Sequence, residues 1–147
     1  GERKHLEVFA ADISAEGRTL MDRFWPGPVT ILFRASPAVS PKLTAGSGTI
    51  GIRLTGHPIA RELSRRLGGP LTATSANLSG APECSTAADV LSQLGGKIDG
   101  LVDGGSTPGG KGSTIVDAAG SAARILREGV IPASLIRDTL EKAARGG

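Results

Sequence analysis

The segment 49–54 (TIGIRL) combines an arginine with a bare stretch of backbone. Its residue types alternate, so a strand here would place Thr49, Gly51 and Arg53 on one face. Glycine lets a ligand approach the backbone closely, and a guanidinium can hold a carboxylate or a phosphate through two parallel hydrogen bonds. This pattern predicts an anion site at Arg53, and the alternative is an ordinary strand edge that faces solvent.

A second candidate site begins in the short segment 71–74, where hydroxyl and amide side chains become dense. These side chains belong to Thr72, Thr74, Ser75, Asn77 and Ser79. Ligands of α/β proteins commonly bind beyond the carboxyl ends of strands, where loop N–H groups and hydroxyls converge. The alternative is that the Ser and Asn side chains only satisfy the backbone of their own loop. The sequence leaves both interpretations open.

The glycine-rich segment 104–113 has the spacing of a phosphate-binding loop between Gly105 and Lys111. Two features count against that interpretation. Gly112 stands where a Mg²⁺-binding Ser or Thr is needed, and the residues that follow resemble a strand instead of the helix that would hold the phosphates. We therefore expect either a flexible loop near a ligand or a plain surface turn.

Histidine and cysteine are too few for several common kinds of site. The chain has two His and one Cys, so neither a Cys/His zinc site nor a Ser-His-Asp triad is expected. Glu83 lies beside Cys84 and argues against a reactive thiolate there. His57 precedes Pro58 at a predicted helix start and is interpreted as structural. No residue is assigned a catalytic role or a metal-binding role.

Helical and strand patterns alternate along the chain. Ser14 can cap a first helix, and Thr86 with Asp89 is a possible capping box. Strands between helices indicate an α/β domain, and the uneven spacing of the later strands favours a mixed sheet. No repeat or linker divides the chain, so we expect a single domain over 1–147. The expected helices are 14–24, 58–67, 86–94 and 132–145, the strands 29–34, 49–54, 71–74, 98–103, 114–117 and 123–127, and the long loop 35–48.

Composition agrees with a globular domain and limits its partners. Of the 147 residues, 39% are hydrophobic, which supplies a core and argues against disorder. No apolar stretch approaches the roughly 20 residues that span a bilayer, so no membrane is expected among the partners. A net charge of +3 permits anionic partners such as nucleotides or RNA without requiring them. A single cysteine is consistent with a reducing cytoplasm, which is the expected location.

Five segments occur together in an order and spacing typical of one family. They are FWPGPVTILF (24–33), GTIGIRLTGHP (48–58), GPLTATSANLSG (69–80), GSTIVD (112–117) and RILREG (124–129). Through them the chain resembles the YrdC-like family of threonylcarbamoyl-AMP synthases. The resemblance implies an α/β fold with a twisted, mixed and mostly antiparallel sheet, flanking helices and a concave face for ligands.

The resemblance also implies an activity. The family joins L-threonine, bicarbonate and ATP into threonylcarbamoyl-AMP and releases pyrophosphate, with Mg²⁺ expected to bridge phosphate oxygens. Another protein then transfers the threonylcarbamoyl group to an adenosine of tRNA. The expected partners therefore include tRNA-modification proteins and tRNA or double-stranded RNA. Two other functions stay open. One is a non-catalytic module that binds double-stranded RNA or tRNA, and the other is a structural or regulatory domain that binds a small carboxylate.

The family's site residues carry over to this chain motif by motif. By resemblance, Arg53 and Ser113 would contact L-threonine, with the Arg53 guanidinium on its carboxylate. This assignment agrees with the strand-face argument given above for Arg53. The residues that would contact ATP are Thr49, Ala73, Ser75 and Arg127, with Asn77 as a further candidate.

Three features depart from the family pattern. Glu83 stands where the family usually has a serine of the ATP site, and a carboxylate near a triphosphate is unfavourable. Gly112 stands where the family often has Glu. The family's N-terminal segment, with its PTDTVYGL-like stretch and its Lys-x-Arg pair, does not precede GERKHLEVF (1–9). We therefore expect an N-terminally truncated domain, and the sequence leaves the activity of this chain on its own open.

Overall fold

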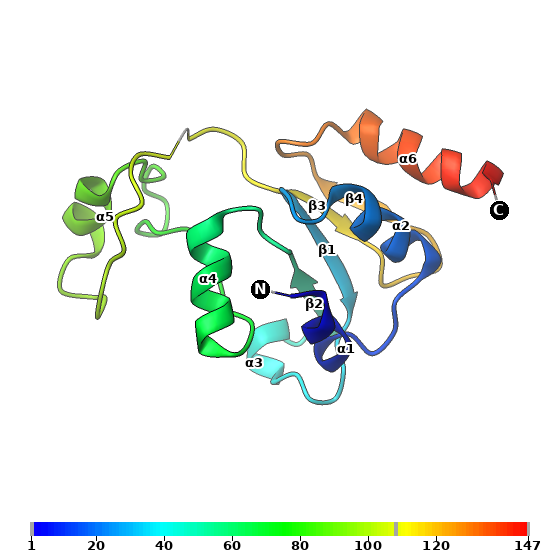
Figure 1. Cartoon of the computed structure of the whole chain (residues 1–147), viewed down its shortest axis with the longest axis horizontal. Coiled ribbons are helices and arrows are strands. Elements are labelled where there is room, and N and C mark those ends of the chain that lie inside the picture. The colour runs from blue at the N-terminus through cyan, green and yellow to red at the C-terminus, as the bar shows by residue number, and fades with distance from the viewer. Residues whose placement is uncertain (1, 108, 147) are drawn as a thin grey trace. The chain divides into compact units, whose positions relative to one another are not determined.

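A computed structural model describes residues 2–107 and 109–146 (Figure 1). The chain forms two compact units, which we describe separately: Gly1–Pro70 with Gly112–Gly147, and Leu71–Lys111. The elements of the first unit are η1 (Arg3–His5), α1 (Leu6–Phe9), α2 (Ala15–Phe24), β1 (Val29–Arg34), α3 (Pro41–Thr44), β2 (Thr49–Ile52), α4 (Pro58–Leu67), β3 (Thr114–Asp117), β4 (Arg124–Arg127) and α6 (Ala133–Gly146). The second unit contains α5 (Ala87–Leu94).

The four described strands form one mixed sheet in the order β2-β1-β3-β4. β1 pairs antiparallel with β2 and parallel with β3, and β3 pairs antiparallel with β4. The prediction of an α/β fold with a mixed sheet and flanking helices is confirmed. This topology brings the end of β4 next to the start of β3, although the two are more than ten residues apart in the chain.

One face of the sheet forms the core of the first unit. Val29, Ile31 and Phe33 alternate along β1 and are fully buried, as is Val116 on β3. Helices α2 and α6 contribute further residues to the same cluster and contact each other along this face (Figure 1). The other face, built from the intervening residues of each strand, is left half-buried or exposed.

The helix ends follow the sequence signals closely. The Ser14 hydroxyl accepts a hydrogen bond from the Gly17 N–H at 3.1 Å and caps α2, as predicted. Pro58 opens α4, and Gly68 closes it with a φ of +74°, a conformation that favours glycine. The expected loop 35–48 contains one short helix, α3, and is otherwise irregular. Within the described residues, no helix has the length and apolarity needed to cross a membrane.

The second unit corrects two predicted strands. Residues 71–74 and 98–103 form no strand, and nearly all of them are exposed. Such short segments become strands only when a neighbouring strand accepts their hydrogen bonds, and none of the described strands does so here. The predicted helix is present as α5, and its Thr86–Asp89 capping box is formed. The strand expected at 49–54 is also shorter, because β2 ends at Ile52.

Candidate functional site

The face of the sheet away from the core gathers four of the predicted site residues, and we call it the open face. The β1–β2 register places Gly51 opposite Leu32 and Thr49 opposite Arg34. These positions alternate with the buried residues of β1, so they point away from the core. Arg53 follows β2 directly and continues the alternation of Thr49 and Gly51. The register bears out the predicted grouping for Thr49 and Gly51. Arg53 lies beyond the last pair of the register, between Ile52 and Leu54, which both pack against the core.

At the centre of the open face, Gly51 has no side chain to cover its neighbours. A Cβ at this position would lie 3.4 Å from the Thr30 Cγ2 atom and 3.8 Å from a Leu32 methyl group. The glycine therefore leaves the Thr30 side chain accessible beside a bare strip of β2 backbone. A ligand on this face could approach both the backbone and the Thr30 hydroxyl.

Ser113 lies on the same face and is held from two sides. Its Oγ is 2.8 Å from the Thr30 Oγ1 on β1, and its carbonyl accepts a hydrogen bond from the Arg127 Nη2 at 2.8 Å. Gly112 leaves room for that guanidinium, since a Cβ there would come within 3.1 Å of the same nitrogen. The structure thus brings Ser113 and Arg127 together across β3 and β4.

Beneath Ser113, the fully buried Thr114 ties the end of β4 to β3. Its Oγ1 donates to the Ile131 carbonyl at 2.6 Å and accepts from the N–H groups of Gly129 and Ile131 at 2.9 and 3.2 Å. The Gly129 backbone passes so close that a Cβ would lie 2.1 Å from the Gly112 carbonyl oxygen. This network fixes the backbone on both sides of the Ser113–Arg127 pair.

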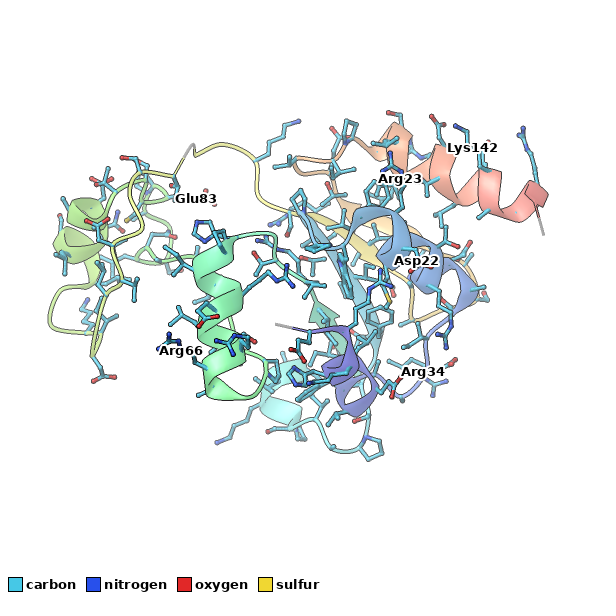
Figure 2. The ribbon with its side chains drawn as sticks, in the orientation of Figure 1. Asp22, Arg23, Arg34, Arg66, Glu83 and Lys142 are labelled. Carbon is cyan, nitrogen blue, oxygen red and sulfur yellow. The ribbon has the colours of Figure 1, made fainter. Side chains whose placement is uncertain are left out.

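The open face is rich in guanidinium groups. Arg53 is exposed and makes a weak contact from Nη2 to the Thr55 hydroxyl at 3.4 Å, and no ion pair is recorded for it among the described residues. Arg34 at the end of β1 is also exposed (Figure 2). Arg124 instead donates to the Asp117 carboxylate at 3.1 Å. Arg53 is therefore available to an anionic ligand, whereas Arg124 is already paired.

The remaining predicted site residues belong to the second unit. Ala73 and Ser75 are exposed and lie outside regular structure. The Asn77 amide nitrogen donates to the carbonyls of Leu78 and Ala81, both at 2.9 Å, while its Oδ1 is buried with no hydrogen-bond partner in the described structure. Asn77 thus shapes its own loop, as the turn interpretation expected. The assignment of all three residues to a nucleotide stays a prediction.

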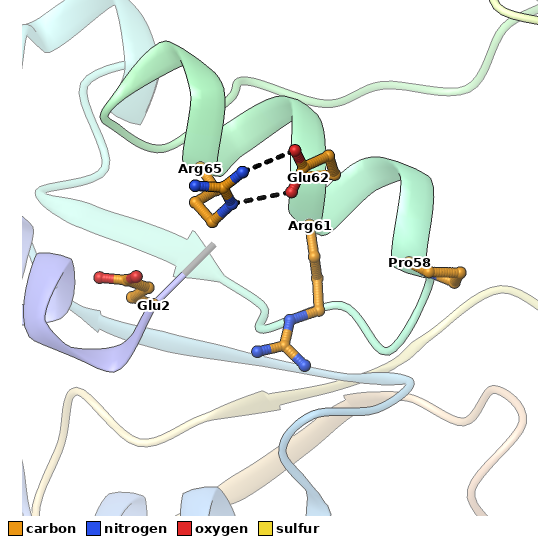
Figure 3. Close-up of a pocket in the computed structure, with 5 residues that line it drawn as sticks. All are labelled: Glu2, Pro58, Arg61, Glu62 and Arg65. Atoms are coloured by element: carbon orange, nitrogen blue, oxygen red, sulfur yellow. Dashed lines mark hydrogen bonds and ion pairs between the residues drawn. The ribbon is translucent and has the colours of Figure 1, made fainter.

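A separate hollow of about 270 Å³ lies between α4 and the N-terminal segment (Figure 3). Both oxygens of Glu62 are held by Arg65, at 2.7 and 2.8 Å, and one of them also by Arg66, at 2.7 Å. Hydrogen bonds from Arg65 and then Arg66 lower the pKa of Glu62 to about 2. None of the predicted site residues lines this hollow, whose lining comprises Glu2, Pro58, Arg61, Glu62 and Arg65.

Thr30 and Thr114 were not found by sequence reasoning. Thr30 lies inside a strand pattern, and only the pairing of β1 with β3 reveals its contact with Ser113. The partners of Thr114 lie 15 and 17 residues further along the chain, so no local pattern indicates them. Among the described residues, no group of three or more His, Cys, Asp or Glu is arranged to hold a metal ion.

The Sua5/YciO/YrdC family model, whose description is "Telomere recombination", matches residues 2–129. This match includes all seven predicted site residues and most of both compact units. The chain belongs to the Sua5/YciO/YrdC family. The YrdC-like resemblance of the five sequence segments is thereby confirmed.

Curated members of the Sua5/YciO/YrdC family include close relatives of this chain. The threonylcarbamoyl-AMP synthase of Bacillus subtilis is 43% identical over 127 residues, which cover 86% of this chain and 37% of that protein. The enzyme of the same name from Pyrococcus abyssi is 38% identical over 88% of this chain and 38% of its own length. The chain therefore spans less than two fifths of the length of these two relatives.

Solved structures of this family share the fold. Pyrococcus abyssi Sua5 complexed with L-threonine matches 95% of this chain and 41% of its own, with a TM-score of 0.89 and 36% identity. Escherichia coli YciO matches 89% of this chain and 64% of its own, with a TM-score of 0.79 and 27% identity. The sheet and helices of this chain are thus those of the Sua5/YciO/YrdC fold.

Proposed function

We propose that this chain is part of a threonylcarbamoyl-AMP synthase, which joins L-threonine, bicarbonate and ATP and releases pyrophosphate. The observation that carries the proposal is the open face, on which Thr49, Ser113 and Arg127 lie. Arg53, just after β2, continues the alternation of Thr49 and Gly51 toward the same face. The names of the Bacillus subtilis and Pyrococcus abyssi relatives support the reaction. The L-threonine in the Pyrococcus abyssi Sua5 complex supports the amino acid substrate.

In this proposal different residues of the open face bind the two ligands, L-threonine and ATP. Arg53 holds the carboxylate of L-threonine, because its exposed guanidinium has a single weak recorded contact to exchange for it. Ser113 contacts the same amino acid through its hydroxyl. Arg127 reaches the phosphates of ATP, and Thr49 contacts the nucleotide. For Ala73, Ser75 and Asn77 of the second unit, contact with a nucleotide stays a prediction that rests on the family resemblance alone.

The proposed chemistry needs positioning and charge stabilisation instead of a covalent enzyme intermediate. The amine of L-threonine attacks carbon dioxide and loses a proton, or condenses with bicarbonate and releases water, to form a carbamate. A carbamate oxygen then attacks the α-phosphorus of ATP, the bond to the β-phosphate oxygen breaks, and pyrophosphate leaves. Guanidinium groups such as Arg53 and Arg127 would stabilise the negative charge of the reactants.

Magnesium would enter this reaction with the nucleotide. The described residues offer no carboxylate cluster for a resident metal, so the phosphate oxygens of ATP would hold Mg²⁺. The product is a threonylcarbamoyl donor, which implies a partner protein that transfers the group to an adenosine of tRNA. The location that this proposal implies is the cytoplasm, where tRNA and ATP are both present.

The test of this proposal is pyrophosphate release by the purified chain. We expect release that requires ATP, L-threonine and bicarbonate together, and a strong reduction in the Arg127→Ala variant. Arg137→Ala, an exposed arginine on α6, is the matched control and should behave like the unchanged chain. Release that continues without L-threonine, or no release even when the family's N-terminal segment is joined to the chain, would contradict the proposal.

A second candidate function is a non-catalytic module that binds double-stranded RNA or tRNA. The observation that favours it is the number of arginines on or beside the open face, together with the net charge of +3. Contacts to phosphates make affinity fall steeply as salt concentration rises. A double-stranded RNA whose affinity for the chain is the same at low and moderate salt would argue against this function.

A further inference from the structure

Within the open face, the hydroxyls of Thr30 and Ser113 form a direct hydrogen bond of 2.8 Å between neighbouring strands. Within the described residues, this is the hydrogen bond that the Thr30 side chain makes. We propose that Thr30 is a positioning residue that orients the Ser113 hydroxyl toward bound L-threonine. This inference rests on the proposed function, because it takes L-threonine as the ligand of Ser113.

The direction of this hydrogen bond follows from the number of protons available. Each hydroxyl has one proton to donate, and a carboxylate can only accept. If Ser113 donates to an oxygen of the L-threonine carboxylate, it has no proton left for Thr30. Thr30 must then donate to Ser113. The result is a chain of donors from Thr30 through Ser113 to the ligand, in which each bond polarises the next.

The surroundings make Thr30 suited to this role. Thr30 is β-branched and lies within β1, so its χ1 angle is restricted, whereas a serine hydroxyl turns easily between rotamers. Gly51 lies on the neighbouring strand β2 and, having no side chain, leaves the Thr30 side chain uncovered. The Ser113 carbonyl is fixed at the same time by Arg127. Thr30 therefore restricts the one remaining freedom of Ser113, which is the direction of its hydroxyl.

The test compares L-threonine binding by four forms of the full chain, measured by calorimetry: unchanged, Thr30→Val, Thr30→Ser and Thr19→Val. Valine keeps the shape of threonine and removes the hydroxyl. We expect Thr30→Val to weaken binding about tenfold, as for a lost hydrogen bond next to a charged group, and Thr30→Ser to restore most of it. Thr19 bonds to the Ala15 carbonyl on α2, so Thr19→Val controls for the loss of a hydroxyl elsewhere.

A second comparison, in the Ser113→Ala background, shows whether Thr30 acts through Ser113. We expect Thr30→Val to have no further effect there. A further loss in that background, or equal weakness of Thr30→Ser and Thr30→Val, would overturn the positioning role and indicate packing. Unchanged binding by Thr30→Val would overturn this inference alone. Failure of the unchanged chain to bind L-threonine would overturn the proposed function and this inference together.

Discussion

Arg53 is the residue on which L-threonine binding should depend most if the proposed function is right. Its guanidinium is exposed on the open face, and a bidentate contact to a carboxylate requires its planar fork. We expect Arg53→Ala to weaken L-threonine binding by at least about tenfold, and Arg53→Lys to recover little of the loss. Calorimetry on the full chain measures this effect, with Arg18→Ala on α2 as the control. L-threonine affinity that does not change in Arg53→Ala would refute the role of Arg53.

Thr114 supports the site without facing it. Replacement by valine would remove a hydroxyl that serves three backbone groups in a fully buried position. Because the two N–H groups would lose their acceptor, we expect Thr114→Val to lower the free energy of unfolding by about 3 kcal/mol. Urea unfolding measures the change. A loss close to that of Thr19→Val, for which we expect about 0.5 kcal/mol or less, would show that the network is unimportant.

At the level of single elements, the titration of the Glu62 carboxyl group on helix α4 can be followed directly. Arg65 and Arg66 lower the pKa of Glu62 from its ordinary value of 4.5 to about 2. The stabilising effect of the charged carboxylate is therefore present above pH 4.5 and is lost as the pH falls through about 2. Carbon NMR of the Glu62 carboxyl group should show its midpoint near pH 2.

Matched variants attribute this low pKa of Glu62 to its two partners. Arg65→Ala combined with Arg66→Ala should move the midpoint up toward 4.5. Lys142→Ala, a cation on α6 (Figure 2), should leave the midpoint where it is. A midpoint near 4.5 in the unchanged chain would mean that the three side chains do not hold this arrangement in solution.

The capping box of α5 gives a second element-level prediction. The Thr86 Oγ1 accepts from the Asp89 N–H at 3.1 Å, and the Asp89 carboxylate accepts from the Thr86 N–H at 3.0 Å. We expect Thr86→Ala to destabilise α5 by about 1 kcal/mol, and Thr86→Ser to keep most of its stability. Hydrogen exchange of the α5 amides measures this loss. Equal protection in Thr86→Ala would contradict the capping role.

Over the whole molecule, the sequence predicted best where the determining interactions are local. Ser14 and Gly68 mark helix ends through contacts within a few residues, and the alternation of 49–54 identifies the face that carries Arg53. Residues 71–74 were predicted as a strand and are irregular, because strand formation depends on a partner strand that the segment itself does not reveal.

Only part of the candidate site was predictable, because most of its contacts join residues that are far apart in the sequence. Ser113 and Arg127 could be assigned only through a family resemblance, and their contact depends on the pairing of β3 with β4. Thr30 joins the site through the β1–β3 pairing, which connects residues more than eighty positions apart. Long-range pairing of this kind leaves no pattern in a single segment of the sequence.

Over the whole molecule, we expect the open face of the sheet to bind L-threonine and ATP together. NMR titration of the isotopically labelled full chain, first with L-threonine and then with ATP, tests it most directly. We expect saturable shifts at Arg53, Ser113 and Thr30 with L-threonine. With ATP we expect further shifts at Thr49 and Arg127, and tighter binding of L-threonine. The contradicting result is saturable shifts confined to α2 and α6, or no saturable shift with either ligand.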